Sequence, residues 1–241
     1  MATLHDLSRA LPHARITGAV GGDTRVHDVT HDSRSVGPGV LFACRPGLVV
    51  DGHDFAPQAV RAGASALLVE RPLALGVPEL VVPSVSDALG PVAARVHGDP
   101  SAAFALCGVT GTNGKTTTVY LLDAALRRAG HETGLVGTVE TVVAGSAVPG
   151  VRTTPEAPEL QRLLRRMADA GVTAAAMEVS SHGLALGRVR GTLFAVAVFT
   201  NLSHDHLDFH RDLDDYFRAK VSLFDPAYTP VGVVNVDDPH G

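Results

Sequence analysis

A glycine-rich segment near the middle of the chain contains the residue types that bind phosphate. It reads Gly-Thr-Asn-Gly-Lys-Thr-Thr from residue 111 to residue 117, and the apolar run Phe104–Cys107 leads into it. Backbone N–H groups of such a loop, at the start of a helix, bind phosphate oxygens, while Lys115 reaches the β- and γ-phosphates and the Thr116 hydroxyl binds Mg²⁺. The general pattern has glycine where this chain has Val109, so an ordinary glycine turn before a helix is the alternative.

Two later polar segments follow apolar, strand-like runs. Glu178 lies at the end of the run Val172–Val179, and residues 201–210 follow the run Phe194–Thr200. Because ligands collect at the carboxyl ends of parallel strands, we expect both segments beside the glycine-rich loop. A carboxylate that ends a strand downstream of a phosphate loop is placed to bind the Mg²⁺ of a nucleotide, although a single glutamate there is often only a surface charge.

The second of these segments contains several potential metal ligands. They are His204, Asp205, His206, Asp208 and His210. A zinc or manganese hydrolase site is one interpretation, because imidazole suits zinc. The alternative is a polar turn in which Asp208 or Asp212 caps the next helix, because one extended segment cannot direct alternate side chains onto one ion. Lys220, further along that helix, is by itself typical of a solvated surface lysine.

The elements that must position these residues predict an α/β protein with two domains. In the first domain we expect helices at Thr3–Leu11, Phe55–Ala62 and Val85–Val96, and strands at Val26–Val29, Val40–Ala43, Ala66–Val69 and Leu80–Val82. The polar segment Thr30–Ser35, between the first two strands, is either a solvated turn or a binding edge in which Ser33 and Arg34 meet an anionic group.

Turn-forming residues at positions 98–101 predict the boundary between a domain of residues 1–98 and one of residues 99–241. In the second domain we expect strands at Phe104–Cys107, Gly134–Val143, Val172–Val179, Phe194–Thr200 and Val231–Val236, a turn over residues 144–150, a helix from Lys115, and helices at Glu159–Ala170 and Asp212–Phe224. The alternation predicts a mostly parallel sheet with helices on both faces.

Composition excludes several classes of protein. The 241 residues have a formal net charge of -5, which argues against a general affinity for nucleic acid or acidic membranes. Cys44 and Cys107 both lie in apolar runs, so we expect free thiols in a reducing compartment. Apolar runs are all shorter than the roughly 18 residues of a membrane span, so we expect a soluble, cytoplasmic protein.

Four motifs in order resemble those of the Mur ligases, the ATP-dependent amino-acid ligases that build the peptidoglycan stem peptide. They are the loop 111–117, Glu178-Val179-Ser180-Ser181-His182, the run from Thr200 to Asp208, and Ala219-Lys220. In addition, Thr30-His31-Asp32-Ser33-Arg34 is similar to the uridine-nucleotide edge of the family branch that adds the third residue of the stem peptide.

The resemblance implies roles for particular residues. It implies that Lys115, Glu178, His206 and Lys220 are catalytic. One Mg²⁺ would bind Thr116 and Glu178, and a second would bind His206 and Lys220, with the lysine carbamylated. The implied ATP-binding residues are Gly111, Thr112, Asn113, Gly114, Lys115, Thr116 and Thr117. The implied substrate-binding residues are His31, Ser33, Leu48, Val49, Val50, Thr153, Thr154, Ser180 and Arg188.

The resemblance also implies a two-step reaction. The terminal carboxylate of UDP-MurNAc-L-Ala-D-Glu attacks the γ-phosphate of ATP to give an acyl phosphate. The amine of a diamino acid, meso-diaminopimelate or L-lysine, then displaces phosphate. Mur ligases continue into a third domain that this sequence lacks, so we expect the chain to be a monomeric fragment that does not ligate alone.

Other functions remain alternatives at this point. Within the family, MurF or folylpolyglutamate synthase are related ligases. Outside it, the chain could be a non-catalytic module that binds a nucleotide or a UDP-sugar, or a metal hydrolase built on the histidine-rich run.

Overall fold

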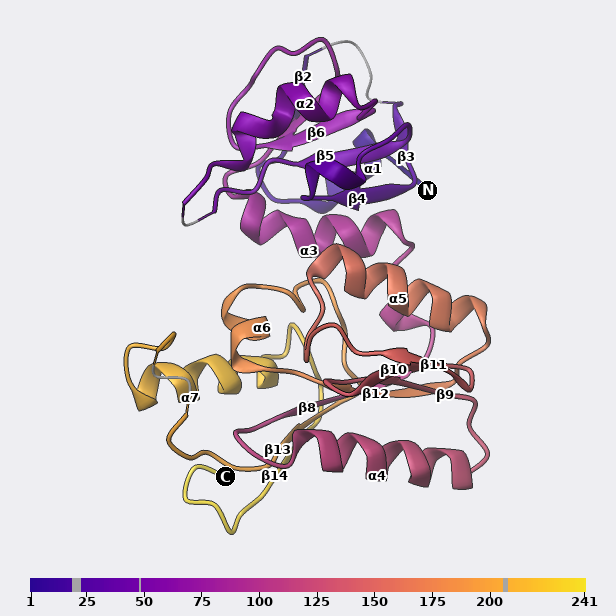
Figure 1. Ribbon diagram of the computed structural model, residues 1–241, viewed down its shortest axis with the longest axis vertical. Coiled ribbons are helices and arrows are strands. Elements are labelled where there is room, and N and C mark those ends of the chain that lie inside the picture. The colour runs from indigo at the N-terminus through magenta and orange to yellow at the C-terminus, as the bar shows by residue number, and fades with distance from the viewer. Residues whose placement is uncertain (19–22, 48, 206–207) are drawn as a thin grey trace. The chain divides into compact units, whose positions relative to one another are not determined.

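The chain forms two compact units, Met1–Asp99 and Pro100–Gly241 (Figure 1). The computed structural model describes residues 1–18, 23–47, 49–205 and 208–241. Along the chain, the boundary between the units falls between Asp99 and Pro100. Gly98 and Asp99 both have positive φ angles, which end the preceding helix.

The first unit contains a five-stranded sheet in the order β2-β7-β6-β5-β4. Neighbouring strands from β4 to β7 are parallel, and β2 is antiparallel to β7. The strands are β2 (Arg15–Thr17), β4 (Asp28–Thr30), β5 (Val40–Ala43), β6 (Ala66–Val69) and β7 (Glu79–Val81). β2 was not predicted from the sequence, because two of its three residues are polar and none of them is fully buried.

The expected single strand Val26–Val29 is wrong. The structure has two short strands there, one on each side of His27, namely β3 (Arg25–Val26) and β4. β3 pairs with β1 (Ala2–Thr3) in a separate antiparallel ribbon, whereas β4 pairs with β5. Two different partners therefore divide one apolar run.

Three helices complete the first unit: α1 (Leu4–Ala10), α2 (Ala56–Arg61) and α3 (Val85–Val96). Thr3 is the N-terminal cap of α1, and its side chain forms a capping box with Asp6. Alternate residues of β5 enter two different cores: Leu41 packs with the residues of α1 and α3, and Phe42 packs with those of α2. The central strands are therefore covered on both faces, which is why they read as continuous apolar runs.

The second unit contains a seven-stranded sheet in the order β11-β10-β9-β12-β8-β13-β14. Five neighbouring strands in this order are parallel, namely β9, β12, β8, β13 and β14. The strands β10 and β11 extend the β9 edge and are antiparallel to their neighbours. The strands are β8 (Ala105–Thr110), β9 (Thr133–Val136), β10 (Glu140–Val143), β11 (Ser146–Pro149), β12 (Ala174–Glu178), β13 (Val196–Phe199) and β14 (Gly232–Val234).

The antiparallel edge corrects two expectations. The run Gly134–Val143 is a hairpin of β9 and β10 instead of one strand, and the expected turn 144–150 contains β11. Ala144 and Gly145 both have positive φ angles, the backbone conformation of a tight two-residue hairpin turn. Alanine rarely adopts that conformation, so Ala144 is not a residue from which a hairpin turn is predicted.

Helices cover both faces of this sheet, as predicted. α4 (Lys115–Arg128) and α5 (Ala157–Asp169) lie on opposite faces, and the short α6 (Ser181–Ala185) and α7 (Leu213–Val221) lie beyond the carboxyl ends of β12 and β13 (Figure 1). Val109 and Val119 belong to the core on the α4 side, and Leu106 and Leu160 to the core on the α5 side.

Two sequence-level expectations concern the whole chain. Cys44 and Cys107 are free, as predicted. The helices in the described ranges are all too short or too polar to cross a membrane.

Candidate nucleotide-binding site

The glycine-rich loop connects β8 to α4, in the order strand, loop and helix that phosphate binding requires. β8 is longer than predicted and includes Val109, which pairs with Glu178 of β12 and Val198 of β13. Val109 is therefore a central strand residue, and the turn itself begins at Gly111. This register explains why the chain departs from the general phosphate-loop pattern.

Residues after β13 support the loop through several hydrogen bonds. The Thr112 backbone N–H donates to Asn201 O (2.9 Å), and the Asn113 N–H donates to Asn201 Oδ1 (2.9 Å). Thr200 Oγ1 donates to Asn113 O (2.7 Å), and Ser203 N–H donates to Thr112 Oγ1 (2.9 Å). Sequence reasoning missed this support. The available signal was a polar segment directly after a strand that neighbours β8.

Gly111 and Gly114 differ in what an added side chain would meet. Gly111 has φ +148°, and a Cβ there would collide with the Thr200 side chain. Gly114 has φ +83°, and a Cβ there would meet nothing within 4 Å. Gly111 thus has two reasons to lack a side chain, and Gly114 has only its backbone conformation.

This difference predicts unequal effects of two matched substitutions. Gly114→Ala should lower the free energy of unfolding by about 1–2 kcal/mol, the strain of an alanine in the left-handed region. Gly111→Ala should lower it by at least about 3 kcal/mol, because the collision adds to the backbone strain. Urea denaturation of the two variants checks this, and equal losses would contradict it.

Lys115 is half-buried at the start of α4 and points back over its own loop. Its Nζ donates to Gly111 O and to Thr112 O, each at 2.8 Å. Burial lowers the pKa of this lysine, and the nearby Glu178 opposes the effect. The two hydrogen bonds place the ammonium group against the loop that would hold the phosphates.

Glu178 ends β12 and is 1% exposed. Its Oε2 accepts a hydrogen bond from Thr116 Oγ1 (2.9 Å), and its Oε1 accepts one from the Thr138 N–H (2.8 Å). A carboxylate and a hydroxyl oxygen thus lie together beside the loop, and oxygen is the ligand type that Mg²⁺ prefers. These residues fit a nucleotide-bound Mg²⁺. Thr138 was missed because it falls inside the single strand expected there.

Lys220 is buried, so its interpretation as a solvated helical lysine is wrong. It is 1% exposed, its Nζ donates to Gly111 O (2.8 Å), and Nζ lies 4.1 Å from the centre of the Tyr216 ring. Burial, and then the charge of Lys115, lower its pKa from 10.5 to about 7. Asp212, directly before α7, is the cap of that helix, because its side chain accepts from the Asp215 N–H (2.7 Å).

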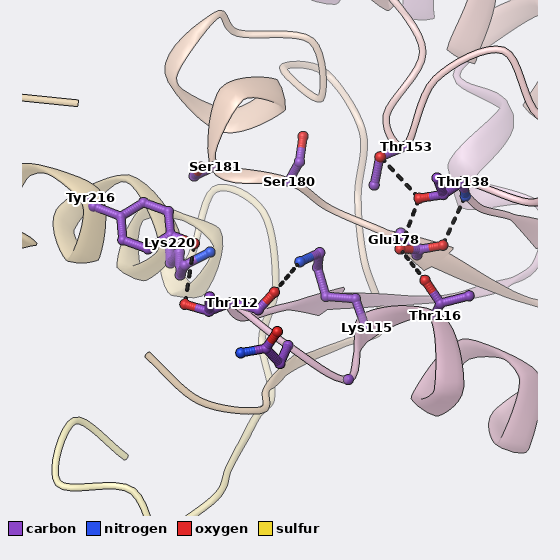
Figure 2. Close-up of a pocket in the computed structure, with 12 residues that line it drawn as sticks. Thr112, Lys115, Thr116, Thr138, Thr153, Glu178, Ser180, Ser181, Tyr216 and Lys220 are labelled. Atoms are coloured by element: carbon purple, nitrogen blue, oxygen red, sulfur yellow. Dashed lines mark hydrogen bonds between the residues drawn. The ribbon is translucent and has the colours of Figure 1, made fainter. Parts of the chain in front are cut away.

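These residues line one pocket of about 290 Å³ (Figure 2). Glu178, Thr116 and Thr138 are grouped on one side, and Lys220 and Tyr216 on another. Lys115 and Lys220, the chain's two lysines, both line it. The complete lining is Thr112, Asn113, Gly114, Lys115, Thr116, Thr138, Thr153, Glu178, Ser180, Ser181, Tyr216 and Lys220.

The residues expected to hold the muramoyl-peptide end have protein partners here. Thr154 is buried, donates to Glu178 O (3.1 Å) and accepts from the Ser180 N–H (3.0 Å). Ser180 caps α6 by accepting from the Gly183 N–H (3.0 Å). Arg188 pairs with Glu156 at 2.9 Å. Thr153 and Ser180 line the pocket, whereas Thr154 and Arg188 support it from outside the lining.

The residues expected to contact uridine nucleotide lie in the first unit. The polar segment after β4 forms a 3₁₀ turn, Ser33–Ser35, capped by Asp32. Arg34 donates to Asp32 from Nε (2.9 Å) and Nη2 (2.8 Å), and these bonds lower the pKa of Asp32 to about 2. His31 and Ser33 are partly exposed on this turn.

The loop expected to help bind the nucleotide is described only in part. Val49 is 94% exposed and Val50 is 50% exposed. Leu48 lies outside the described residues, as does His206 of the second unit.

The histidine-rich run does not form a metal cluster in the described part of the chain, where no three His, Cys, Asp or Glu side chains gather to hold an ion. His210 is buried, and its ring centroid lies 5.1 Å from that of Tyr216. The described residues therefore give the hydrolase interpretation no support.

Comparison with known proteins identifies the family. The sequence profile of the Mur ligase middle domain matches residues 109–241, more than half of the chain. The chain belongs to the Mur ligase family. A second profile, described as the catalytic domain of the Mur ligase family, matches residues 25–97.

Individual Mur ligases are similar over nearly the whole chain. The UDP-N-acetylmuramoyl-L-alanyl-D-glutamate--2,6-diaminopimelate ligase of Streptomyces avermitilis is 47% identical over 242 residues, covering 96% of this chain and 48% of that protein. The ligase of the same name from Geobacillus thermodenitrificans is 47% identical over 226 residues, covering 91% of this chain and 46% of that protein. The chain thus spans about half the length of the curated relatives it matches.

Solved structures show the same fold. A structure of a ligase with the same name superposes with a TM-score of 0.83 at 31% identity, covering 99% of this chain and 48% of that one. The MurF ligase of Thermotoga maritima, solved with ADP, superposes with a TM-score of 0.60 at 24% identity, covering 90% of this chain and 47% of that one. The predicted fold class and family resemblance are confirmed.

Proposed function

We propose that this Mur ligase chain carries the UDP-substrate and ATP sites of a MurE-type ligase, which joins a diamino acid to UDP-MurNAc-L-Ala-D-Glu at the expense of ATP. One observation carries the proposal: Lys115, the Thr116–Glu178 pair and the buried Lys220 line a single pocket at the carboxyl edge of the parallel sheet. The names of the relatives favour diaminopimelate over L-lysine as the diamino acid.

In the first step a substrate carboxylate and the γ-phosphate must approach each other, although both are anions. The N–H groups of the loop 111–117 would bind the triphosphate, and the Lys115 ammonium would leave its loop carbonyls for the phosphate oxygens. A positive charge fixed where negative charge develops lowers the barrier to acyl phosphate formation.

The oxygen atoms of Thr116 and Glu178 also suit a divalent metal ion. Thr116 and Glu178 would hold one Mg²⁺, and His206 with carbamylated Lys220 would hold a second. When bound, the ions neutralise phosphate charge and orient the reacting oxygens. An ammonium group repels a cation, whereas a carbamate offers it anionic oxygen, so modification of Lys220 makes it a suitable ligand.

The buried position of Lys220 favours this modification. Carbon dioxide reacts with the neutral amine, and a lysine with a pKa of about 7 is half neutral at neutral pH. We expect a carbamate on Lys220 that increases as the pH rises through about 7, instead of near the 10.5 of an exposed lysine. ¹³C NMR of the chain equilibrated with ¹³CO₂ measures it, and Lys220→Ala identifies the signal. A signal that persists in Lys220→Ala, or that is absent from the chain without substitutions, would contradict the expectation.

The remaining roles concern the substrate. His31, Ser33 and the loop Leu48-Val49-Val50 would contact the UDP part, and Thr153, Thr154, Ser180 and Arg188 would hold the muramoyl-peptide end. The protein would act as a monomer in the cytoplasm, where its nucleotide substrates are, without nucleic acid or membrane partners.

Binding of the two substrates tests the proposal directly. Isothermal titration of the 241-residue chain should show saturable binding of Mg·ATP and of UDP-MurNAc-L-Ala-D-Glu. Preference for the dipeptide over the corresponding UDP-MurNAc-tripeptide would separate a MurE-type site from a MurF-type site. If the chain bound neither Mg·ATP nor UDP-MurNAc-L-Ala-D-Glu, the proposal would be rejected. A preference for the UDP-MurNAc-tripeptide would reject the MurE assignment.

A further inference from the structure

The Ser181 hydroxyl is buried at the wall of the pocket (Figure 2). Ser181 is 1% exposed, and its Oγ has no hydrogen-bond partner in the part of the chain that the structure describes. Buried hydroxyls are nearly always hydrogen-bonded, so one without a partner beside a ligand pocket calls for an explanation. The simplest explanation is an acceptor that enters the pocket with a ligand or a modification.

The neighbouring serine differs in this respect. Ser180 Oγ accepts from the Gly183 N–H (3.0 Å) and lies 3.1 Å from Thr154 Oγ1, so it is used in holding α6 in place. Of the two adjacent serines in the pocket wall, Ser180 therefore positions the helix, and Ser181 retains an unused donor.

Ser181 lies on the side of the pocket that contains Lys220. α6, which begins at Ser181, packs against α7, which carries Tyr216 and Lys220. Aromatic contacts join the two helices: the His182 and His210 ring centroids are 5.7 Å apart, and those of His210 and Tyr216 are 5.1 Å apart. These contacts hold α6 against the helix face from which Lys220 enters the pocket.

Carbamylation of Lys220 would create a new acceptor at this place. The nitrogen lone pair attacks the carbon of CO₂, an N–C bond forms, one C=O electron pair moves to oxygen, and an amine proton leaves to water. The nitrogen keeps one hydrogen, which can still be donated to Gly111 O. The two new oxygens carry the negative charge and need donors.

Another hydroxyl near Lys220 is already engaged. Thr112 Oγ1 accepts from Tyr216 OH (3.2 Å) and from the Ser203 N–H (2.9 Å), and it donates to Ser203 O (3.3 Å). Ser181 has no such commitment.

We propose that the Ser181 hydroxyl donates a hydrogen bond to the carbamate on Lys220 and so sets the CO₂ concentration at which the lysine becomes modified. This inference rests on the Lys220 carbamate proposed above. It assigns Ser181 as a positioning residue, because it would act on the substrate and the metal only through Lys220.

Titration of the 241-residue chain with ¹³CO₂, followed by ¹³C NMR of the Lys220 carbamate, tests the assignment. Ser181→Ala should need roughly tenfold more CO₂ for half-modification, the size of the effect of a hydrogen bond to a charged group. Ser222→Ala is the matched control, because Ser222 is exposed and its hydroxyl already donates to Ala219 O (2.7 Å). We expect the Ser222→Ala variant to need the same CO₂ concentration for half-modification as the chain without substitutions. Ser181→Thr, which keeps a hydroxyl, should recover most of the loss.

The possible outcomes separate the inference from the proposal beneath it. A carbamate that forms equally in the unmodified sequence and in Ser181→Ala overturns the role of Ser181 and leaves the carbamate intact. An equal loss in Ser181→Ala and Ser181→Thr shows that packing is responsible and also overturns it. If the chain without substitutions forms no carbamate on Lys220, the proposal that this lysine is carbamylated is overturned.

Discussion

Replacing Lys115 with alanine is expected to weaken binding of Mg·ATP by about 100-fold, which corresponds to ~3 kcal/mol. The Lys115 ammonium contacts two carbonyls of the loop, and hydrogen bonds from a charged donor to phosphate oxygens contribute about 1.5–3 kcal/mol each. In the free protein the same ammonium donates to Gly111 O and Thr112 O, so the alanine variant also loses two bonds that hold the loop. Isothermal titration with Mg·ATP measures the affinity.

Two further measurements make the result specific. Arg128→Ala removes a positive charge from an exposed position on the same helix, so it should leave the affinity within about twofold. Urea denaturation of Lys115→Ala shows whether a lower affinity reflects the lost cation or a disordered loop. ATP affinity that is unchanged in a folded Lys115→Ala variant would end the case for this pocket as the nucleotide site.

Replacing Glu178 with glutamine is expected to remove the Mg²⁺ dependence of ATP binding. The glutamine carbonyl can still accept from the Thr138 N–H, so the shape of the site is kept while the negative charge is lost. We expect roughly tenfold or greater loss of affinity, about 1.4 kcal/mol or more, in the presence of Mg²⁺, and little change when EDTA removes the ion. Titrations with and without Mg²⁺ measure the difference.

Glu140 offers the matched control for this substitution. Its carboxylate accepts from Tyr120 OH (2.8 Å) at the start of β10, and it is not among the residues that line the pocket. Glu140→Gln removes the same charge and should retain the full Mg²⁺ effect. If Glu178→Gln kept that effect as well, the ion would have to bind elsewhere.

Local patterns in the sequence predicted the residues that lie at strand ends. The phosphate loop follows from glycine and lysine types between an apolar strand and a helix, and Glu178 follows from its position at the end of an apolar run. The capping of α7 by Asp212 is equally local, because the cap residue and the N–H group it binds are three positions apart. Each of these features depends on neighbours in the chain, which is why the sequence reveals them.

Pairing between distant segments decided the rest. The sequence did not show that Val109 pairs with Glu178 and Val198, and that register determines where the loop begins. It did not show that Asn201 would hold a loop 88 positions earlier in the chain. Strand register and loop support depend on which segments meet in the folded sheet.

The two residues that matter most for the proposed chemistry illustrate the difference. The sequence by itself determined the glycine-rich loop with Lys115, the carboxylate of Glu178 at the end of a strand, and an α/β chain of the Mur ligase type. Only the tertiary structure buried Lys220 and brought it to the same pocket as Lys115, where burial lowers its pKa to about 7. The tertiary structure also left the buried Ser181 hydroxyl, which lines that pocket, without a described hydrogen-bond partner. A residue's type is written in the chain, but its solvent exposure and the charges around it are set by segments far away in sequence, and those determine its reactivity.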